Sequence, residues 1–126
     1  MKQQQGFSIS KRFKSFTYAF NGLKILLMEE HNSWIHLLAA MAVVIAGFVF
    51  QLSAIEWIAV VFAIGLVIAL EIINSAIENL SDFVSPGQHE AIKKVKDLSA
   101  AGVLVGAITA VIIGLIVFVP KIAGLF

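Results

Sequence analysis

Three long apolar segments restrict the fold of this chain more than any other feature. They run from Ile35 to Leu52, from Ala54 toward Asp82, and from Ala100 to Val119. At 1.5 Å per residue, the eighteen residues of the first segment cover about 27 Å, close to the thickness of a bilayer's hydrocarbon core. Because lipid offers no partners for backbone polar groups, we expect each segment to span the membrane as a helix.

Composition supports this interpretation. Of the 126 residues, 60% are hydrophobic and 13% are charged, with a mean hydropathy of +0.95, whereas soluble domains are about 45–50% apolar. The net charge of +1 argues against a nucleic-acid partner, which a clustered basic face would bind. We predict an all-α membrane protein of one domain, 1–126, with transmembrane helices over 35–52, 54–82 and 91–119, the last two including cytoplasmic extensions.

A different helix is expected before the first span. Between residues 10 and 28 the large apolar side chains recur on one helical face while the basic ones lie away from it, which is typical of an amphipathic helix at the membrane surface. The apolar face consists of Phe13, Phe16, Phe20, Leu23 and Leu27. Such a helix is equally compatible with covering an active site at the membrane edge and with simple anchoring.

The placement of basic residues predicts the orientation. Lysine and arginine occur before the first span and between the second and third, but not in the short first connection; they are Lys2, Lys11, Arg12, Lys14, Lys24, Lys93, Lys94 and Lys96. The positive-inside rule then places the N-terminus in the cytoplasm and the C-terminus outside. We expect the membrane to be the cytoplasmic (inner) cell membrane. Lys121 alone argues weakly against this orientation.

The third span carries a line of small residues at a spacing of four. Such lines allow two helices to approach closely, although glycines that merely face lipid are the alternative. The line consists of Gly102, Gly106, Ala110 and Gly114. Pro120 is expected to end this helix, because proline lacks the N–H that helical bonding requires.

Polar residues on the second span form the strongest functional indication. With about 100° of rotation per residue, Glu71, Asn74, Glu78 and Asp82 fall within one narrow face directly after an apolar run. Carboxylates are costly there and usually serve ions, protons or phosphate-bearing ligands. Carboxylate oxygens suit Mg²⁺, which shares its remaining positions with phosphates and water. The nearby Lys96-Asp97 dipeptide adds a cation that complements phosphate charge.

Other nucleotide and metal motifs are missing from the sequence. Neither a GxxxxGK[ST] loop nor a GxGxxG loop occurs, so nucleotide binding requires another architecture. The histidines give little indication of zinc, since His31 and His36 point about 140° apart on a helix and His89 lies in a polar connection.

Several of these residues match a family pattern. The run EIINSAIEN from Glu71 to Asn79, with Asp82, His89 and KDLSAA from Lys96 to Ala101, closely resembles the small prokaryotic diacylglycerol kinase and undecaprenol kinase family. The resemblance covers about residues 12 to 119. It implies a homotrimer with three transmembrane helices and one surface helix per subunit, which transfers the γ-phosphoryl group of Mg-ATP to a lipid alcohol at the cytoplasmic membrane edge, between subunits.

The resemblance also implies roles for individual residues. Glu30 and Glu78 are expected to hold the Mg²⁺ of the nucleotide, Glu71 to act as the base, and Asn74 to position it. The remaining nucleotide contacts are expected from Tyr18, Lys96, Asp97, Asp82, His89 and either Lys11 or Arg12. Ala19 stands where the family has a serine, which removes one possible hydroxyl contact.

The acceptor lipid is indicated by one short segment. Residues 32–36 (NSWIH) are similar to undecaprenol kinases, whereas typical diacylglycerol kinases have a glutamate at the position of His36. We therefore expect undecaprenol as acceptor, contacted by Trp34, His36 and Glu71, with diacylglycerol as the alternative. A small ion or proton translocator and a non-catalytic membrane subunit are the competing classes of function.

Overall fold

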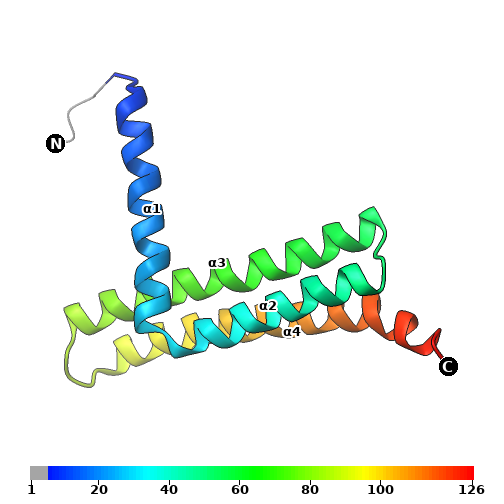
Figure 1. The fold of residues 1–126 in the computed structure, drawn as a ribbon. Coiled ribbons are helices and arrows are strands. Elements are labelled where there is room, and N and C mark those ends of the chain that lie inside the picture. Colours follow the sequence, from blue (N-terminus) through cyan, green and yellow to red (C-terminus); the bar gives the residue numbers. More distant parts are fainter. Residues whose placement is uncertain (1–5) are drawn as a thin grey trace.

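The computed structural model describes residues 6–126, so the predicted role of Lys2 in orientation lies outside the described residues. These residues form four helices: α1 (Ile9–Glu29), α2 (His31–Val49), α3 (Ala54–Val84) and α4 (Glu90–Ala123). In Figure 1, α2, α3 and α4 run alongside one another, while α1 crosses their direction at one end. The α3–α4 connection lies at the same end as α1, and the C-terminus lies at the other.

The predicted all-helical class with three membrane-length helices is confirmed. Helices α2, α3 and α4 are each long and apolar enough to cross a bilayer. The first of them ends three residues earlier than predicted, at Val49, because Gln51 adopts a left-handed backbone conformation with φ 54°. That conformation is unfavourable for a residue with a side chain, and it reverses the chain before α3 begins.

Helix α3 starts at a capping box. The Ser53 hydroxyl accepts a hydrogen bond from the backbone N–H of Glu56 at 3.3 Å, and the Glu56 carboxylate accepts one from the N–H of Ser53 at 3.0 Å. This reciprocal pair satisfies two backbone donors that the first turn leaves without helical partners. The Glu56 carboxylate also forms an ion pair at 3.1 Å with Lys121 of α4.

The prediction that Pro120 ends the last helix is wrong. Helix α4 contains Pro120 and continues to Ala123, and the carbonyl of Pro120 accepts a hydrogen bond from the N–H of Gly124 at 3.1 Å. Proline removes one donor, but the Lys121–Glu56 ion pair holds the following turn against the start of α3. Lys121, the basic residue that disagreed with the predicted orientation, therefore has a local partner.

Close contacts at two glycines fix the helix packing. A Cβ added at Gly47 of α2 would lie 2.5 Å from the Trp57 ring of α3, and one at Gly106 of α4 would lie 2.4 Å from Leu70 of α3. Around Gly102 and Gly114, by contrast, no atom of another described helix lies within 4 Å of such a Cβ. Of the three glycines in the line of small residues, Gly106 is thus the one used for close packing among residues 6–126.

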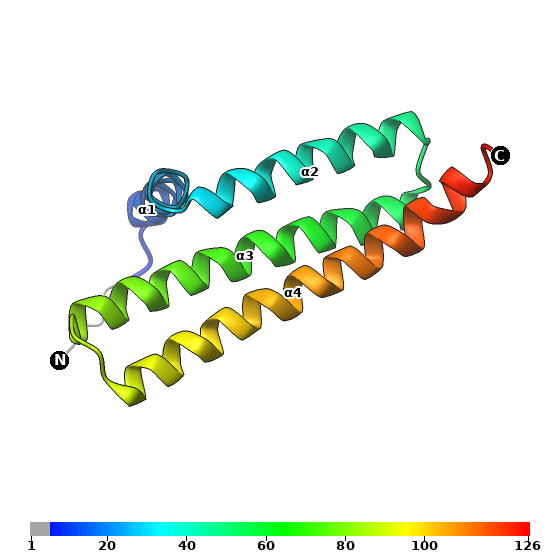
Figure 2. The same ribbon diagram turned by 90° about the horizontal axis from the view of Figure 1, so that it is seen from below.

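Helix α3 lies between α2 and α4, as Figure 2 shows. Within residues 6–126, α2 and α4 both pack on α3 but not on each other. A cavity of about 320 Å³ remains between the three helices, and its lining is apolar except for His36. We call it the apolar groove. Small residues widen it; they are Ala39, Ala40, Ala63, Ala107, Ala110 and Gly114.

Most large apolar side chains of the three long helices are exposed. The buried apolar residues are few: Leu26, Leu52, Val60, Ala63 and Val117. Soluble monomers rarely expose apolar surface so continuously, so these faces suit contact with lipid or with other subunits.

Candidate active site

Three residues of the polar face predicted on the second span form a stripe along α3 together with Ser75, whereas the fourth, Asn74, contacts α4. Glu71, Ser75, Glu78 and Asp82 follow one another at intervals of four, three and four residues, which keeps them on one side of a helix. Glu71 and Ser75 are buried, at 7% and 6% exposure, whereas Asp82 is exposed. The stripe therefore leads from the interior of the helical bundle to its surface at the α3–α4 connection.

Glu71 contacts α2 at the buried end of the stripe. Its Oε1 lies 2.8 Å from Nε2 of His36, and the side chains of the two residues are 9% and 29% exposed, respectively. Leucine and isoleucine side chains from α1, α2 and α3 surround the pair. His36 also lines the apolar groove, so the structure places Glu71 next to the end of that groove.

Glu30 occupies the single residue between α1 and α2, where its extended backbone interrupts the helix. Its N–H donates to the carbonyl of Leu26 at 3.0 Å, and its own carbonyl accepts from the Ser33 hydroxyl at 2.6 Å. Its carboxylate accepts a hydrogen bond from the Ser75 hydroxyl of α3 at 3.3 Å. The break between the two helices thus brings Glu30 to the acidic stripe.

Trp34 stabilises this break between the helices. Its indole N–H donates to the carbonyl of Leu27 at 2.7 Å, satisfying a carbonyl at the end of α1 that has no helical partner. Half of the Trp34 residue remains exposed. Its polar group is therefore used within the chain, and its exposed ring surface remains free for the predicted lipid contact.

The predicted Mg²⁺ ligands Glu30 and Glu78 are related through Ser75 of α3. Ser75, which contacts Glu30, lies three residues before Glu78 on the same face of α3. Among residues 6–126 there is no group of three or more histidines, aspartates or glutamates that could hold a metal. Mg²⁺ commonly takes one or two carboxylates and completes its shell with phosphate oxygens and water, so two carboxylates match its requirements.

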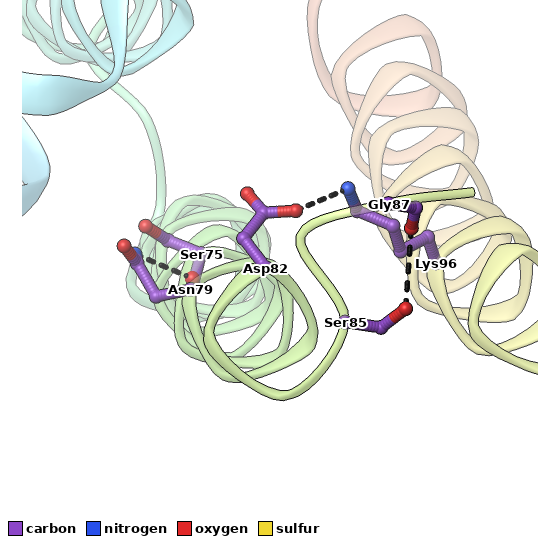
Figure 3. Close-up of polar contacts among 6 residues, drawn as sticks. All are labelled: Ser75, Asn79, Asp82, Ser85, Gly87 and Lys96. Atoms are coloured by element: carbon purple, nitrogen blue, oxygen red, sulfur yellow. Dashed lines mark hydrogen bonds and ion pairs between the residues drawn. The ribbon is translucent and has the colours of Figure 1, made fainter. Parts of the chain in front are cut away.

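Asp82 and Lys96 connect α3 to α4 at the exposed end of the stripe. Their carboxylate and ammonium groups lie 2.6 Å apart, and Figure 3 shows Lys96 reaching across to Asp82 beside the turn at Ser85 and Gly87. A surface hollow of about 560 Å³ at this turn is lined by Asp82, Lys96 and His89, among others. Three of the residues predicted to lie near a nucleotide therefore share one hollow.

Asp97 and His89, both predicted to lie near the nucleotide, also make local contacts. Asp97 forms an ion pair with Lys93 at 2.6 Å, so the neighbouring Lys96 and Asp97 belong to different pairs. His89 caps α4, because its Nδ1 accepts a hydrogen bond from the N–H of Ala91 at 3.1 Å.

Asn74 contacts a residue that the sequence analysis did not select. Its side-chain carbonyl accepts a hydrogen bond from the Ser99 hydroxyl of α4 at 2.7 Å, rather than contacting Glu71 as its predicted positioning role suggests. Ser99 and Ser75 were both missed. Helical spacing could have found them, since Ser99 follows Lys96 by three residues and Ser75 follows Glu71 by four.

The predicted nucleotide contacts on α1 lie apart from those on α4. Lys11, Arg12 and Tyr18 are exposed, and the Arg12 guanidinium lies 5.1 Å from the ring centre of Phe7. Among the described residues, α1 packs on α2 and α3 but not on α4. One chain therefore does not bring these three residues to Lys96 and Asp97.

Comparison with known proteins finds several similar kinases. The undecaprenol kinase of Bacillus subtilis is 40% identical over 114 residues, which is 90% of this chain and 93% of that protein. A diacylglycerol kinase of Synechocystis is 35% identical over 88% of this chain but only 64% of its own length. That of Escherichia coli K12 is 30% identical over 79% of this chain and 81% of its own. The family model for prokaryotic diacylglycerol kinase matches residues 17–118, and the chain belongs to this family of lipid kinases.

Proposed function

We propose that this protein phosphorylates a membrane lipid alcohol with Mg-ATP, and that undecaprenol is the acceptor. The observation that carries the proposal is the position of the α3 stripe. Its buried end at Glu71 adjoins the apolar groove, and its exposed end at Asp82 adjoins the hollow that contains Lys96. A lipid hydroxyl arriving from the membrane and a phosphate arriving from the cytoplasm would meet along this stripe.

The charged residues in and beside the stripe have distinct tasks in the proposed transfer. Glu71 accepts the proton of the lipid hydroxyl as its oxygen attacks the γ-phosphorus, and the bond from that phosphorus to ADP breaks. Lys96 attracts phosphate oxygens, and Asp82 orients its ammonium group through the 2.6 Å contact. Glu30 and Glu78 would hold Mg²⁺, which neutralises phosphate charge when bound. Positioning and charge neutralisation supply most of the catalysis in such transfers.

The shape of the apolar groove supports a polyprenol as acceptor. Its walls carry alanine residues and a glycine, and His36 is the polar residue at its lining. A single slender isoprenoid chain with one terminal hydroxyl fits such a groove better than two acyl chains with ester carbonyls. The 40% identical relative is an undecaprenol kinase, whereas the diacylglycerol kinases compared above are 30–35% identical.

Competition between the two lipids tests the acceptor. We expect a higher kcat/KM for undecaprenol than for diacylglycerol when both compete for labelled ATP in detergent micelles. Replacing His36 with glutamate should reduce this ratio more than it changes ATP use, because an ionised carboxylate accepts hydrogen bonds but cannot donate them. A preference of the unmodified protein for diacylglycerol would overturn the choice of acceptor and leave the kinase proposal intact.

Assembly and orientation belong to the same proposal. The separation of Lys11, Arg12 and Tyr18 from α4 within one chain supports a site shared between subunits of a homotrimer. The basic residues of α1 and of the start of α4 support a cytoplasmic location for the site, with the C-terminus outside and α1 at the membrane surface. Light scattering of the detergent-solubilised protein should give the mass of three chains; the mass of one chain would contradict the shared site.

A further inference from the structure

We infer that His36 is a positioning residue for Glu71: its imidazole holds one carboxylate oxygen and leaves the other free to receive the proton of the acceptor hydroxyl. This inference rests on the proposed function and assigns His36 a role in the transfer step itself. The 2.8 Å contact between Nε2 of His36 and Oε1 of Glu71 carries it.

Burial makes such a partner necessary. Glu71 is only 7% exposed and is surrounded by leucine and isoleucine side chains from three helices. A buried carboxylate without a hydrogen-bond donor is strongly destabilised. Among the described side chains, His36 is the polar partner of Glu71, and its Nε2 contacts Oε1 rather than Oε2. The imidazole therefore selects one orientation of the carboxylate, with Oε2 available for a substrate.

The backbone around His36 is held in place by the break between α1 and α2. Ser33, one turn earlier, is buried, and its hydroxyl lies 2.6 Å from the carbonyl of Glu30 and 3.2 Å from that of Leu26. Trp34 adds its hydrogen bond to Leu27. Since side chains are oriented accurately only when their own backbone is fixed, these contacts make His36 a suitable support for Glu71.

His36 also meets the acceptor side of the site. It lines both the apolar groove and the smaller space around Glu71, so it lies where the groove reaches the carboxylate. Nε2 is the ring nitrogen that lies 2.8 Å from the Glu71 carboxylate, and a neutral imidazole can donate from one ring nitrogen while the other accepts. The same side chain thus fixes the base beside the point where a lipid hydroxyl would emerge from the groove.

Two replacements separate hydrogen bonding from shape. His36→Phe keeps a ring but removes the donor, whereas His36→Gln keeps an N–H donor on a side chain of similar reach. We expect His36→Phe to lower kcat by about 10- to 100-fold for undecaprenol and diacylglycerol alike, as a misplaced catalytic group does. The KM for ATP should change less than about twofold, and His36→Gln should recover most of the lost kcat.

Control variants and the native enzyme make each result decisive. Leu38→Ala alters an exposed side chain of α2, which is 63% exposed, and should leave kcat near the native value. If His36→Phe fails to purify as folded protein, His36→Leu replaces it. Any of three results would overturn the positioning role. The donor-free variant, His36→Phe or His36→Leu, could keep the native kcat; His36→Gln could be as slow as the donor-free variant; or the effect could be confined to the choice of lipid. Absence of transfer by the native protein would instead overturn the proposed function itself.

Discussion

Replacing Glu78 with glutamine is expected to lower turnover by about 10²-fold or more while the protein stays folded. The exchange preserves the shape of the side chain but removes the negative charge that we assign to Mg²⁺ binding, and metal stabilisation of transferring phosphoryl groups is worth several kcal/mol. Glu78 is partly exposed on α3, so the change leaves little buried polarity uncompensated. Steady-state kinase activity over a range of Mg²⁺ concentrations measures the effect.

Glu29→Gln is the matched control for this experiment. Glu29 is an exposed carboxylate at the end of α1 and has no part in the proposed site. It should retain native turnover and native dependence on Mg²⁺. Native activity in the Glu78 variant would remove Glu78 from the metal site.

Replacing Glu71 with glutamine should lower kcat by about 10²–10⁴-fold, the usual contribution of a positioned general base. The KM for ATP should change little, because Glu71 lies at the buried end of the stripe and the hollow around Lys96 lies at the exposed end. Initial rates at varied ATP and varied lipid separate the two parameters. A loss that appeared mainly as weaker ATP binding would assign Glu71 to the nucleotide site.

The sequence predicts what depends on a single helix. The three apolar segments specify the long helices, and the periodicity of α3 places Glu71, Glu78 and Asp82 on one face, because both features follow from local geometry. The end of α2 and the end of α4 were less predictable. The left-handed conformation of Gln51 and the ion pair of Lys121 depend on how the ends of α2 and α4 meet α3.

Contacts between helices could not be predicted in the same way. Whether His36 reaches Glu71, or Ser99 reaches Asn74, depends on the relative rotation and register of packed helices, which apolar periodicity leaves open. The pairing of Lys96 shows this clearly. Its neighbour in sequence is Asp97, yet its ammonium group pairs with Asp82 on α3, while Asp97 pairs with Lys93 one helical turn away.

The central claim is that the α3 stripe supports Mg²⁺-dependent transfer of phosphate to a lipid alcohol. The most direct measurement incubates the purified, detergent-solubilised protein with γ-labelled ATP and undecaprenol, with and without Mg²⁺, and follows label in the extracted lipid. We expect labelled undecaprenyl phosphate only when Mg²⁺ is present, and almost none from the Glu78→Gln variant. Absence of label in undecaprenol and in diacylglycerol with the native protein and Mg²⁺ would contradict the central claim.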